Sequence, residues 1–201
     1  KPFKNNYPFF RGNLHGHSKH SDGNLTSEEV IKNYKKLGYH FTCLSDHLWE
    51  KTYFSATTIN DTSHFNSSDF ITITSAELHC PGKKYVKDGL WHFVANGLPT
   101  DFEKSNHNET GPELVNRAKN AGAFVSVAHP EWYSLTSEEA ISVSHAHAVE
   151  IYNHGSTIKS ARGSGKAVAD ILLQEGKRIN LVATDDSHFR IDDCGGGWVM
   201  V

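Results

Sequence analysis

The chain of 201 residues has few cysteines, and none of them form a metal or redox motif. Cys43, Cys80 and Cys194 are odd in number and lack C-x-x-C spacing, which argues against a disulfide framework and favours reduced thiols in the cytoplasm. The sequence also has no apolar run close to the roughly 20 residues that a membrane helix needs. We therefore expect a protein with no membrane association.

An excess of positive charge is absent as well. The 20 Lys and Arg residues are balanced by 23 Asp and Glu residues, and no basic block stands out, so there is no strong case for a nucleic-acid partner. A hydrophobic share of 37% is typical of a soluble globular protein, and a chain of this length can bury one sizeable core. We expect a single domain over residues 1–201, while the oligomeric state stays open.

Histidine, in contrast, is abundant, with 14 residues in the chain. The densest run covers residues 15–23, where His15, His17 and His20 precede Asp22. Neutral imidazole is the commonest metal ligand, and residues i and i+2 of a strand face the same side. His15 and His17 could therefore hold one ion together, although a polar histidine-rich loop is the simpler interpretation of this run alone.

Apolar runs alternate with helical patterns along the chain, which indicates an α/β fold with a largely parallel sheet, open or closed into a barrel. Predicted strands cover residues 13–15, 41–45, 70–76, 91–98, 124–128, 149–152 and 180–184, with an incomplete last strand at 198–201. Predicted helices lie within 26–38, 112–122 and 167–174. We expect residues 49–68 and 99–111 to be long loops that could overhang a site.

Potential metal ligands stand where these predicted strands end. In parallel α/β folds the carboxyl ends of the strands form the rim at which ligands bind. The residues in question are His15, His17, His47, Glu77, His129, Asp186 and His188, together with His92 inside a strand and Asp22 in the first loop. Because surface histidines would not fall at this rim repeatedly, the sequence predicts a metal site.

The same residues carry a family resemblance. The motifs are His15-x-His17 with Ser21-Asp22-Gly23, then Ser45-Asp46-His47, Ala76-Glu77, His92, Ala128-His129-Pro130 and Asp186-x-His188. In this order they resemble the PHP (polymerase and histidinol phosphatase) domain family, from His15 to His188. The resemblance implies a distorted, TIM-like (β/α)7 barrel, a trinuclear metal centre and phosphoesterase activity on a small phosphorylated molecule.

Carried over by position, the resemblance assigns ligands to three ions. The first ion would be held by His15, His17, Glu77 and Asp186; the second by Glu77, His92 and His129; the third by Asp22, His47 and His188. His79 is an alternative to His92, and His20 is an alternative to Asp22.

The chemistry of this ligand set can be argued without the family. Nitrogen and oxygen ligands without cysteine suit two to three divalent ions of Zn, Mn or Fe. Two such ions, about 3.5–4 Å apart, can share a hydroxide and clamp the attacking and leaving oxygens. We therefore expect direct attack of a metal-bridging hydroxide on a phosphate ester, with Glu77 and Asp186 as the central catalytic carboxylates.

Residues around the ions are harder to predict. Arg162, Arg190 and Lys84 are candidate phosphate-binding cations, although ordinary solvated surface charge is the alternative for each. Other candidate roles are a proton donor to the leaving group (His154), partners that orient imidazoles (Asp46 and Asp185) and a pocket wall (Trp132).

Two further functions remain open at this point. The same ions could hydrolyse a non-phosphate bond, as in an amidohydrolase, because a bridging hydroxide also attacks carbonyl carbon. The chain could also be a non-catalytic, metal-stabilised binding module. The complete ligand set favours an enzyme, but the sequence does not name its substrate.

Overall fold

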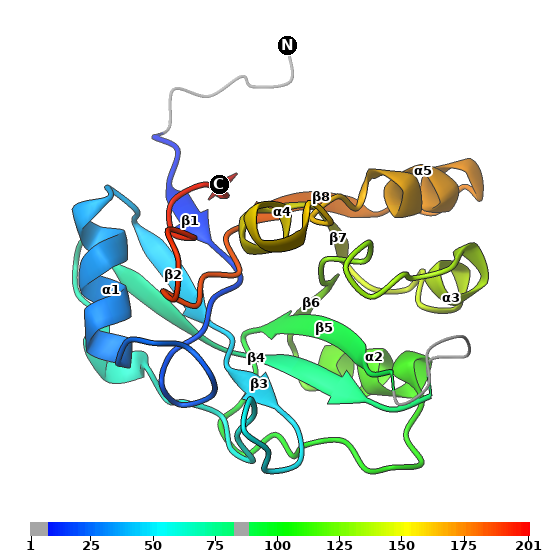
Figure 1. The fold of residues 1–201 in the computed structure, drawn as a ribbon, viewed down its shortest axis with the longest axis horizontal. Coiled ribbons are helices and arrows are strands. Elements are labelled where there is room, and N and C mark those ends of the chain that lie inside the picture. Colours follow the sequence, from blue (N-terminus) through cyan, green and yellow to red (C-terminus); the bar gives the residue numbers. More distant parts are fainter. Residues whose placement is uncertain (1–7, 83–88) are drawn as a thin grey trace.

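Seven strands form the wall of a barrel-shaped sheet in this computed structural model, which describes residues 8–82 and 89–201 (Figure 1). They are β1 (Arg11–Asn13), β2 (Phe41–Leu44), β4 (Ile71–Cys80), β5 (Trp91–Asn96), β6 (Phe124–Val127), β7 (Ala148–Asn153) and β8 (Asn180–Thr184). The sheet order is β8-β7-β6-β5-β4-β2-β1-β9, and β9 (Val199–Met200) adds an edge strand beside β1. The short β3 (His47–Leu48) continues the path of β2 and pairs with β4.

The barrel is nearly closed between its first and last strands. The chain beyond β1 meets the chain beyond β8 in a parallel bridge between Gly16 and Ser187. Asp186 donates its backbone N–H to the carbonyl of His15 at 2.9 Å, and His17 donates to the carbonyl of Ser187, also at 2.9 Å. The predicted TIM-like α/β barrel is confirmed, and its seam lies among the predicted ligands.

Two strands break the parallel pattern: the edge strand β9 is antiparallel to β1, and β5 is antiparallel within the barrel wall. β5 runs antiparallel to both β4 and β6, while β1, β2 and β4 pair in parallel, as do β6, β7 and β8. β4 and β5 are consecutive strands in the chain and pair directly with each other. Their register places Glu77 opposite Val94 and His79 opposite His92. This hairpin is the main distortion of the barrel.

Helices cover the outside of the sheet (Figure 1). They are α1 (Ser27–Lys36), α2 (Gly111–Asn120), α3 (Ser137–Ser142), α4 (His154–Ser160) and α5 (Lys166–Gln174), with a 3₁₀ turn at Ser63–Phe65. α1, α2 and α3 each begin with a capping box, in which a threonine and a glutamate three residues later satisfy each other's backbone N–H groups. The predicted helix starts near Thr26 and Pro112 agree with the structure.

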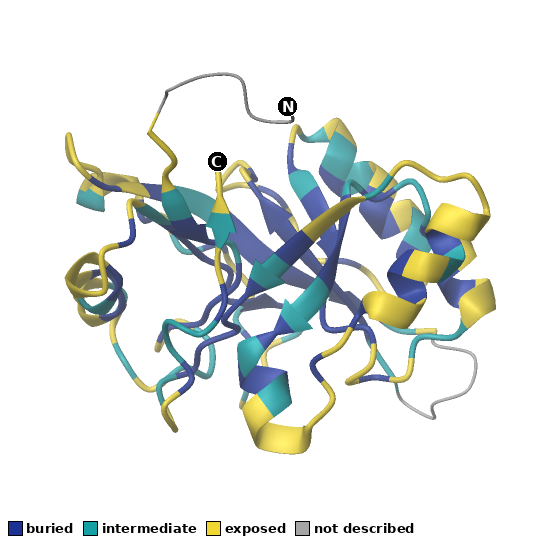
Figure 2. Ribbon diagram, turned by 90° about the horizontal axis from the view of Figure 1, so that it is seen from above, coloured by how far each residue is buried: buried dark blue, intermediate teal, exposed yellow. Residues whose placement is uncertain are grey.

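The apolar core lies between the sheet and these helices rather than inside the barrel. One cluster, which includes Phe93, Leu114 and Val125, fills the space between the sheet and α2, and a second lies under α1 around Tyr34. Figure 2 shows most of the strand length buried and the exposed residues concentrated on helices and loops, although β8 begins with two exposed residues. The barrel interior instead holds buried polar side chains, which positions a site there.

The two predicted long loops differ in their relation to that interior. Tyr53 and Phe54, from the loop after β3, line the cavity described below, whereas the described lining includes no residue of 99–111. Within residues 8–82 and 89–201, no helix is long and apolar enough to cross a membrane.

Candidate metal centre

Glu77 is the centre of the polar interior. It lies in β4 and is fully buried. Five imidazoles approach its two carboxylate oxygens: the nearest ring nitrogens lie at 2.7 Å (His92), 2.9 Å (His47), 3.1 Å (His129), 3.3 Å (His15) and 3.4 Å (His17). A fully buried carboxylate surrounded by ring nitrogens needs positive charge close by, from a bound cation or from protonated imidazoles.

Four overlapping clusters of possible ligands share this carboxylate or its neighbours, and three of them correspond to the predicted ion sites. In each cluster the candidate ligand atoms lie within 4.8 Å of one another. The first contains His15, His17, Glu77 and Asp186; the second contains Glu77, His92 and His129; the third contains His17, Asp22, His47 and His188. The structure therefore brings together all nine positions predicted from the sequence, in the same groupings, with His17 added to the third.

The ligand atoms of the first cluster come from both sides of the barrel seam. The Nε2 atoms of His15 and His17 lie 3.2 Å apart, and Asp186 Oδ1 lies 3.3 Å from the former and 3.0 Å from the latter. The second cluster differs in that His92 presents Nδ1 to Glu77, at 2.7 Å, whereas His129 presents Nε2. In the third, Asp22 Oδ1 lies 3.4 Å from Nε2 of His47 and 3.3 Å from Nε2 of His188.

These atoms fit a divalent ion. Glu150 can only accept a hydrogen bond, so His15 carries a proton on Nδ1 and directs Nε2 at the oxygens of Glu77 and Asp186. A lone pair on that nitrogen would repel these oxygens unless a cation lay among them. Asp22 Oδ1 is likewise buried and has no hydrogen bond within the described residues. Buried charges of this kind are normally paired or coordinate metals.

The pKa shifts of the buried histidines and of Glu77 also fit a site for a cation. Burial and the neighbouring His188 and His47 lower the pKa of His17 to about 3, which keeps its ring in the neutral form that binds metals. Burial alone would raise the pKa of Glu77, but His47 and His15 hold it well below its usual range. Burial alone would lower the pKa of His15, but Asp186, Glu150 and Glu77 raise it well above its usual value, so these three carboxylates favour positive charge at this position.

Two residues that hold the ligands were not predicted from the sequence. Glu150, fully buried in β7, accepts from His15 Nδ1 at 2.7 Å and from the backbone N–H of His129 at 2.8 Å. Asn153, also in β7, donates its side-chain amide to Glu150 at 2.9 Å and to Asp186 at 3.2 Å. Such contacts fix the ring orientation and tautomer of a ligand.

His79 was considered as an alternative to His92 in the second cluster, but in the structure it contacts His47. Its Nδ1 lies 3.1 Å from the carbonyl of Trp91 and its Nε2 lies 2.8 Å from Nδ1 of His47. Donation to the carbonyl leaves Nε2 as an acceptor, so His47 donates Nδ1–H to it and turns Nε2 towards Asp22. His79 also forms a possible ligand group with His47 and Glu77.

Asp46 and Asp185 do not orient imidazoles, contrary to expectation. Asp46 accepts from the backbone N–H and hydroxyl of Ser18, both at 2.8 Å, and from the hydroxyl of Ser21 at 2.7 Å, which shapes the loop that carries Asp22. Asp185 accepts from the backbone of two glycines near the C-terminus and from a tyrosine hydroxyl. Serine groups therefore take the hydrogen bonds of Asp46, and backbone N–H groups with a tyrosine hydroxyl take those of Asp185.

Two ligands have strained backbone conformations. The φ angles of His129 and Asp186 are 21° and 53°, a region that residues other than glycine rarely adopt. Both backbones are held by hydrogen bonds, from His129 N–H to Glu150 and from Asp186 N–H to the carbonyl of His15. Strain of this kind concentrates at functional sites.

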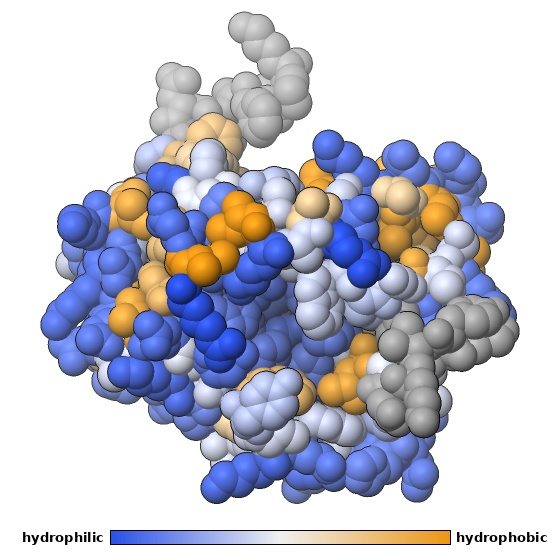
Figure 3. Space-filling model, in the orientation of Figure 1, coloured by the Kyte–Doolittle hydropathy of each residue, from blue (hydrophilic) through white to orange (hydrophobic). Residues whose placement is uncertain are grey.

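A cavity of about 640 Å³ opens over the clusters, and the space-filling view shows a hollow with a hydrophilic floor (Figure 3). Its lining includes seven of the nine predicted ligands, three cations and several aromatic side chains. The cations are Lys159, Arg162 and Arg190. Arg162 and Arg190 were predicted for this role, whereas Lys159 was not. Lys84 lies outside the described residues.

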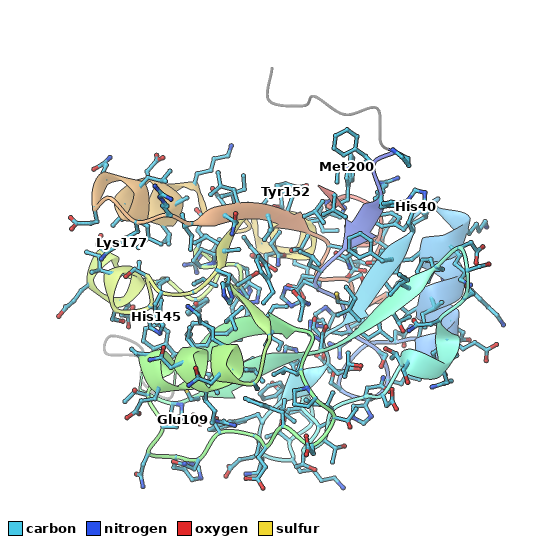
Figure 4. The ribbon with its side chains drawn as sticks, turned by 180° about the vertical axis from the view of Figure 1, so that it is seen from behind. His40, Glu109, His145, Tyr152, Lys177 and Met200 are labelled. Atoms are coloured by element: carbon cyan, nitrogen blue, oxygen red, sulfur yellow. The ribbon has the colours of Figure 1, made fainter. Side chains whose placement is uncertain are left out.

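His154 is not among the lining residues. Its Nδ1 lies 2.9 Å from the hydroxyl of Tyr152, and its ring packs over Gly196. Its expected role as a proton donor stays a prediction. Several other histidines pair with the backbone away from the cavity: His40 accepts from Arg11 N–H, and His145 lies 3.2 Å from the carbonyl of Pro112. Figure 4 shows both at the periphery of the molecule.

No protein-family model matches the sequence, and no curated protein matches it. Among solved structures, the chain is similar to a two-domain protein from Bacteroides vulgatus that contains a predicted PHP-like metal-dependent phosphoesterase, with a TM-score of 0.62 and 18% identity over 90% of this chain. This chain spans 53% of that protein, about half of its length.

Two further solved structures resemble the chain over nearly their whole length. One is a protein from Bifidobacterium adolescentis named as a metal-dependent phosphoesterase (TM-score 0.60, 12% identity, 92% of this chain and 89% of that one). The other is an amidohydrolase from Chromobacterium violaceum with bound sulfate and no metal (TM-score 0.65, 13% identity, 94% of this chain and 90% of that one). At these identities the likeness shows the fold alone, and the fold that the sequence resemblance implied is confirmed.

Proposed function

We propose that this chain is a metal-dependent hydrolase that cleaves the phosphate ester of a small molecule, with two to three divalent ions of Zn, Mn or Fe. The observation that carries the proposal is the fully buried Glu77, which is shared by five imidazoles at the floor of a cavity with cationic side chains in its wall. The three clusters around it would hold the ions. The similar proteins named as phosphoesterases support the same function.

In this proposal the bound ions and the cationic side chains of the cavity would bind different oxygens of the phosphate. Divalent ions, when bound, lower the pKa of water and offset negative charge on phosphoryl oxygens. Lys159, Arg162 and Arg190 would bind the remaining phosphate oxygens, since cationic side chains recognise phosphate by charge-assisted hydrogen bonds. Lys159 is held 3.4 Å from Asp193 and Arg190 is held 3.3 Å from Asp22, so both are already directed along the cavity wall.

The test is the replacement Glu77→Gln together with metal removal and reloading. Glutamine keeps the size of the side chain but lacks the charge that the five imidazoles surround. We expect hydrolysis of phosphate esters to fall by on the order of 10³-fold or more, with near-native secondary structure by circular dichroism. Full activity after complete removal of metal by a chelator would contradict the proposal.

A second candidate is hydrolysis of an amide or another non-phosphate bond, which the similar amidohydrolase favours. A panel of phosphate esters and amides, assayed after loading with Zn, Mn or Fe, separates the two candidates. Turnover of amides alone would favour the second. Tight metal binding without turnover of either class would instead indicate a metal-stabilised binding module.

We also propose that residues 1–201 form one domain that functions in the cytoplasm. The three cysteines are free thiols in the structure, with Cys43 and Cys80 buried, as a reducing compartment permits. Limited proteolysis of the metal-loaded protein should leave one resistant core. Thiol titration in denaturant without reductant should give three reactive groups per chain.

A further inference from the structure

Trp132 stands out among the tryptophans of the chain. It exposes 45% of its surface and lines the cavity, whereas Trp49 and Trp91 expose only 7% and 5%. The centroid of its ring lies 5.4 Å from that of His92 and 5.4 Å from that of His129. A large aromatic side chain therefore remains open to the cavity directly beside two proposed ligands.

Other apolar side chains extend this part of the wall. Tyr133, Phe54 and Leu90 line the same cavity, and the ring of Phe54 lies 5.4 Å from that of His47. These residues come from the loop after β6, the loop after β3 and the approach to β5. Three separate segments thus contribute apolar surface where a substrate would lie.

The cavity is larger than a phosphate group requires. Its volume of about 640 Å³ lies in the range of 300–1,000 Å³ that is typical of pockets for drug-sized ligands. The floor, made of the three clusters, and the cations Lys159, Arg162 and Arg190 would bind the phosphoryl group. The remaining wall, around Trp132, is left for the rest of the substrate.

We propose that the leaving group of the substrate carries a planar aromatic or heteroaromatic ring that packs against Trp132. The proposal rests on the phosphoesterase function proposed above and specifies its substrate class. Aromatic rings gain free energy from stacked or edge-to-face contact beyond the area that they bury, and a saturated ring of similar size does not.

Benzyl phosphate and cyclohexylmethyl phosphate provide the test because both are monoesters of primary alcohols of similar size and reactivity. With the metal-loaded full chain, we expect kcat/KM for the benzyl ester to be higher by roughly 2- to 12-fold. In Trp132→Ala this ratio should fall to about one, and in Trp132→Phe it should be largely retained. Thermal melting checks that each variant is folded.

Trp198→Ala is the matched control. Trp198 is exposed to 42%, close to the value for Trp132, but it packs on the guanidinium of Arg11, outside the cavity lining. Its replacement should leave the ratio of the two esters unchanged.

Binding provides a readout that does not depend on turnover. The non-hydrolysable benzylphosphonate should bind the metal-loaded protein more tightly than cyclohexylmethylphosphonate in calorimetry, and Trp132→Ala should remove the difference. Equal kcat/KM and equal affinity in the wild type, or a preference that persists in Trp132→Ala, would overturn the proposal. Absence of turnover for both esters would contradict the phosphoesterase function instead, while the binding preference would still decide the question of the ring.

Discussion

Replacing Glu150 with glutamine is expected to lower the affinity of the protein for divalent metal by roughly 10- to 100-fold. One carboxylate oxygen of Glu150 accepts from His15 Nδ1 at 2.7 Å. The other accepts from the backbone N–H of His129 at 2.8 Å and from the side chain of Asn153 at 2.9 Å. All three donors are buried, so none can turn to water instead.

Glutamine has a single acceptor oxygen for these three donors. It should direct this oxygen at His129 and Asn153, because that side has two donors, and its NH₂ group then faces His15. The NH₂ group can only donate, so His15 must accept at Nδ1 and carry its proton on Nε2. That nitrogen faces Glu77 and Asp186 and would no longer have a lone pair for an ion.

A 10- to 100-fold loss corresponds to about 1.4–2.7 kcal/mol, which is within the range for a lost charge-assisted hydrogen bond. Competition with a chromogenic chelator measures the affinity without reference to activity. In zinc-loaded wild type, long-range ¹H–¹⁵N spectra should show a proton on His15 Nδ1, and this signal should be absent in Glu150→Gln.

Glu113→Gln is the control because Glu113 belongs to the capping box of α2 and glutamine can keep that role. Its metal affinity should equal that of the wild type. If Glu150→Gln also binds zinc within twofold of the wild type and keeps the Nδ1 proton, Glu150 does not set the tautomer of His15.

Two further predictions concern stability. Burial raises the pKa of Cys43 from 9.0 to about 12, so above pH 9 the unfolded chain loses this proton before the folded chain does, and stability falls as pH rises. Between pH 9 and 10.5 the loss from this thiol should be about 1–2 kcal/mol in urea unfolding of the metal-free protein, and Cys43→Ala should show a correspondingly shallower slope. Asp46→Ala should cost about 1–3 kcal/mol, because it leaves the buried N–H of Ser18 without its acceptor, and should weaken metal binding at Asp22; an unchanged melting temperature would contradict this role.

The sequence was informative where a local pattern reports a local structure. Thr26 or Ser27, followed by early acidic residues, predicted the start of α1. Seven of the nine positions that the structure brings together were read from residue types at predicted strand ends, whereas His92 lay inside a predicted strand and Asp22 in a predicted loop. The capping box at Thr136 and Glu139 is the same signal and could have predicted α3. Pro81-Gly82, after β4, is a turn signal consistent with the hairpin that makes β5 antiparallel.

Other features depend on contacts between distant segments and leave no local pattern. Glu150 stands in an apolar strand, and only the fold shows that it meets His15, 135 residues earlier in the chain. The positive φ angles of His129 and Asp186 could not be predicted either, because neither position is a glycine, the residue that usually indicates this conformation. Ser18 and Ser21, which donate hydrogen bonds to Asp46, are 28 and 25 residues away in the sequence, so these bonds could not be predicted from the sequence around Asp46.

The position of the barrel seam has a consequence for folding. The strands that meet at the bridge between Gly16 and Ser187 are among the most distant in sequence, so closing the barrel requires one of the longest loops that this chain can form. His15 and Asp186, joined across the seam by a backbone hydrogen bond, also belong to one ligand cluster. An ion bound by His15 and Asp186 would hold the two segments together and offset the entropy that is lost when the barrel closes. Amide exchange at the seam should therefore slow on metal binding far more than exchange in β4 and β5, where pairing is local.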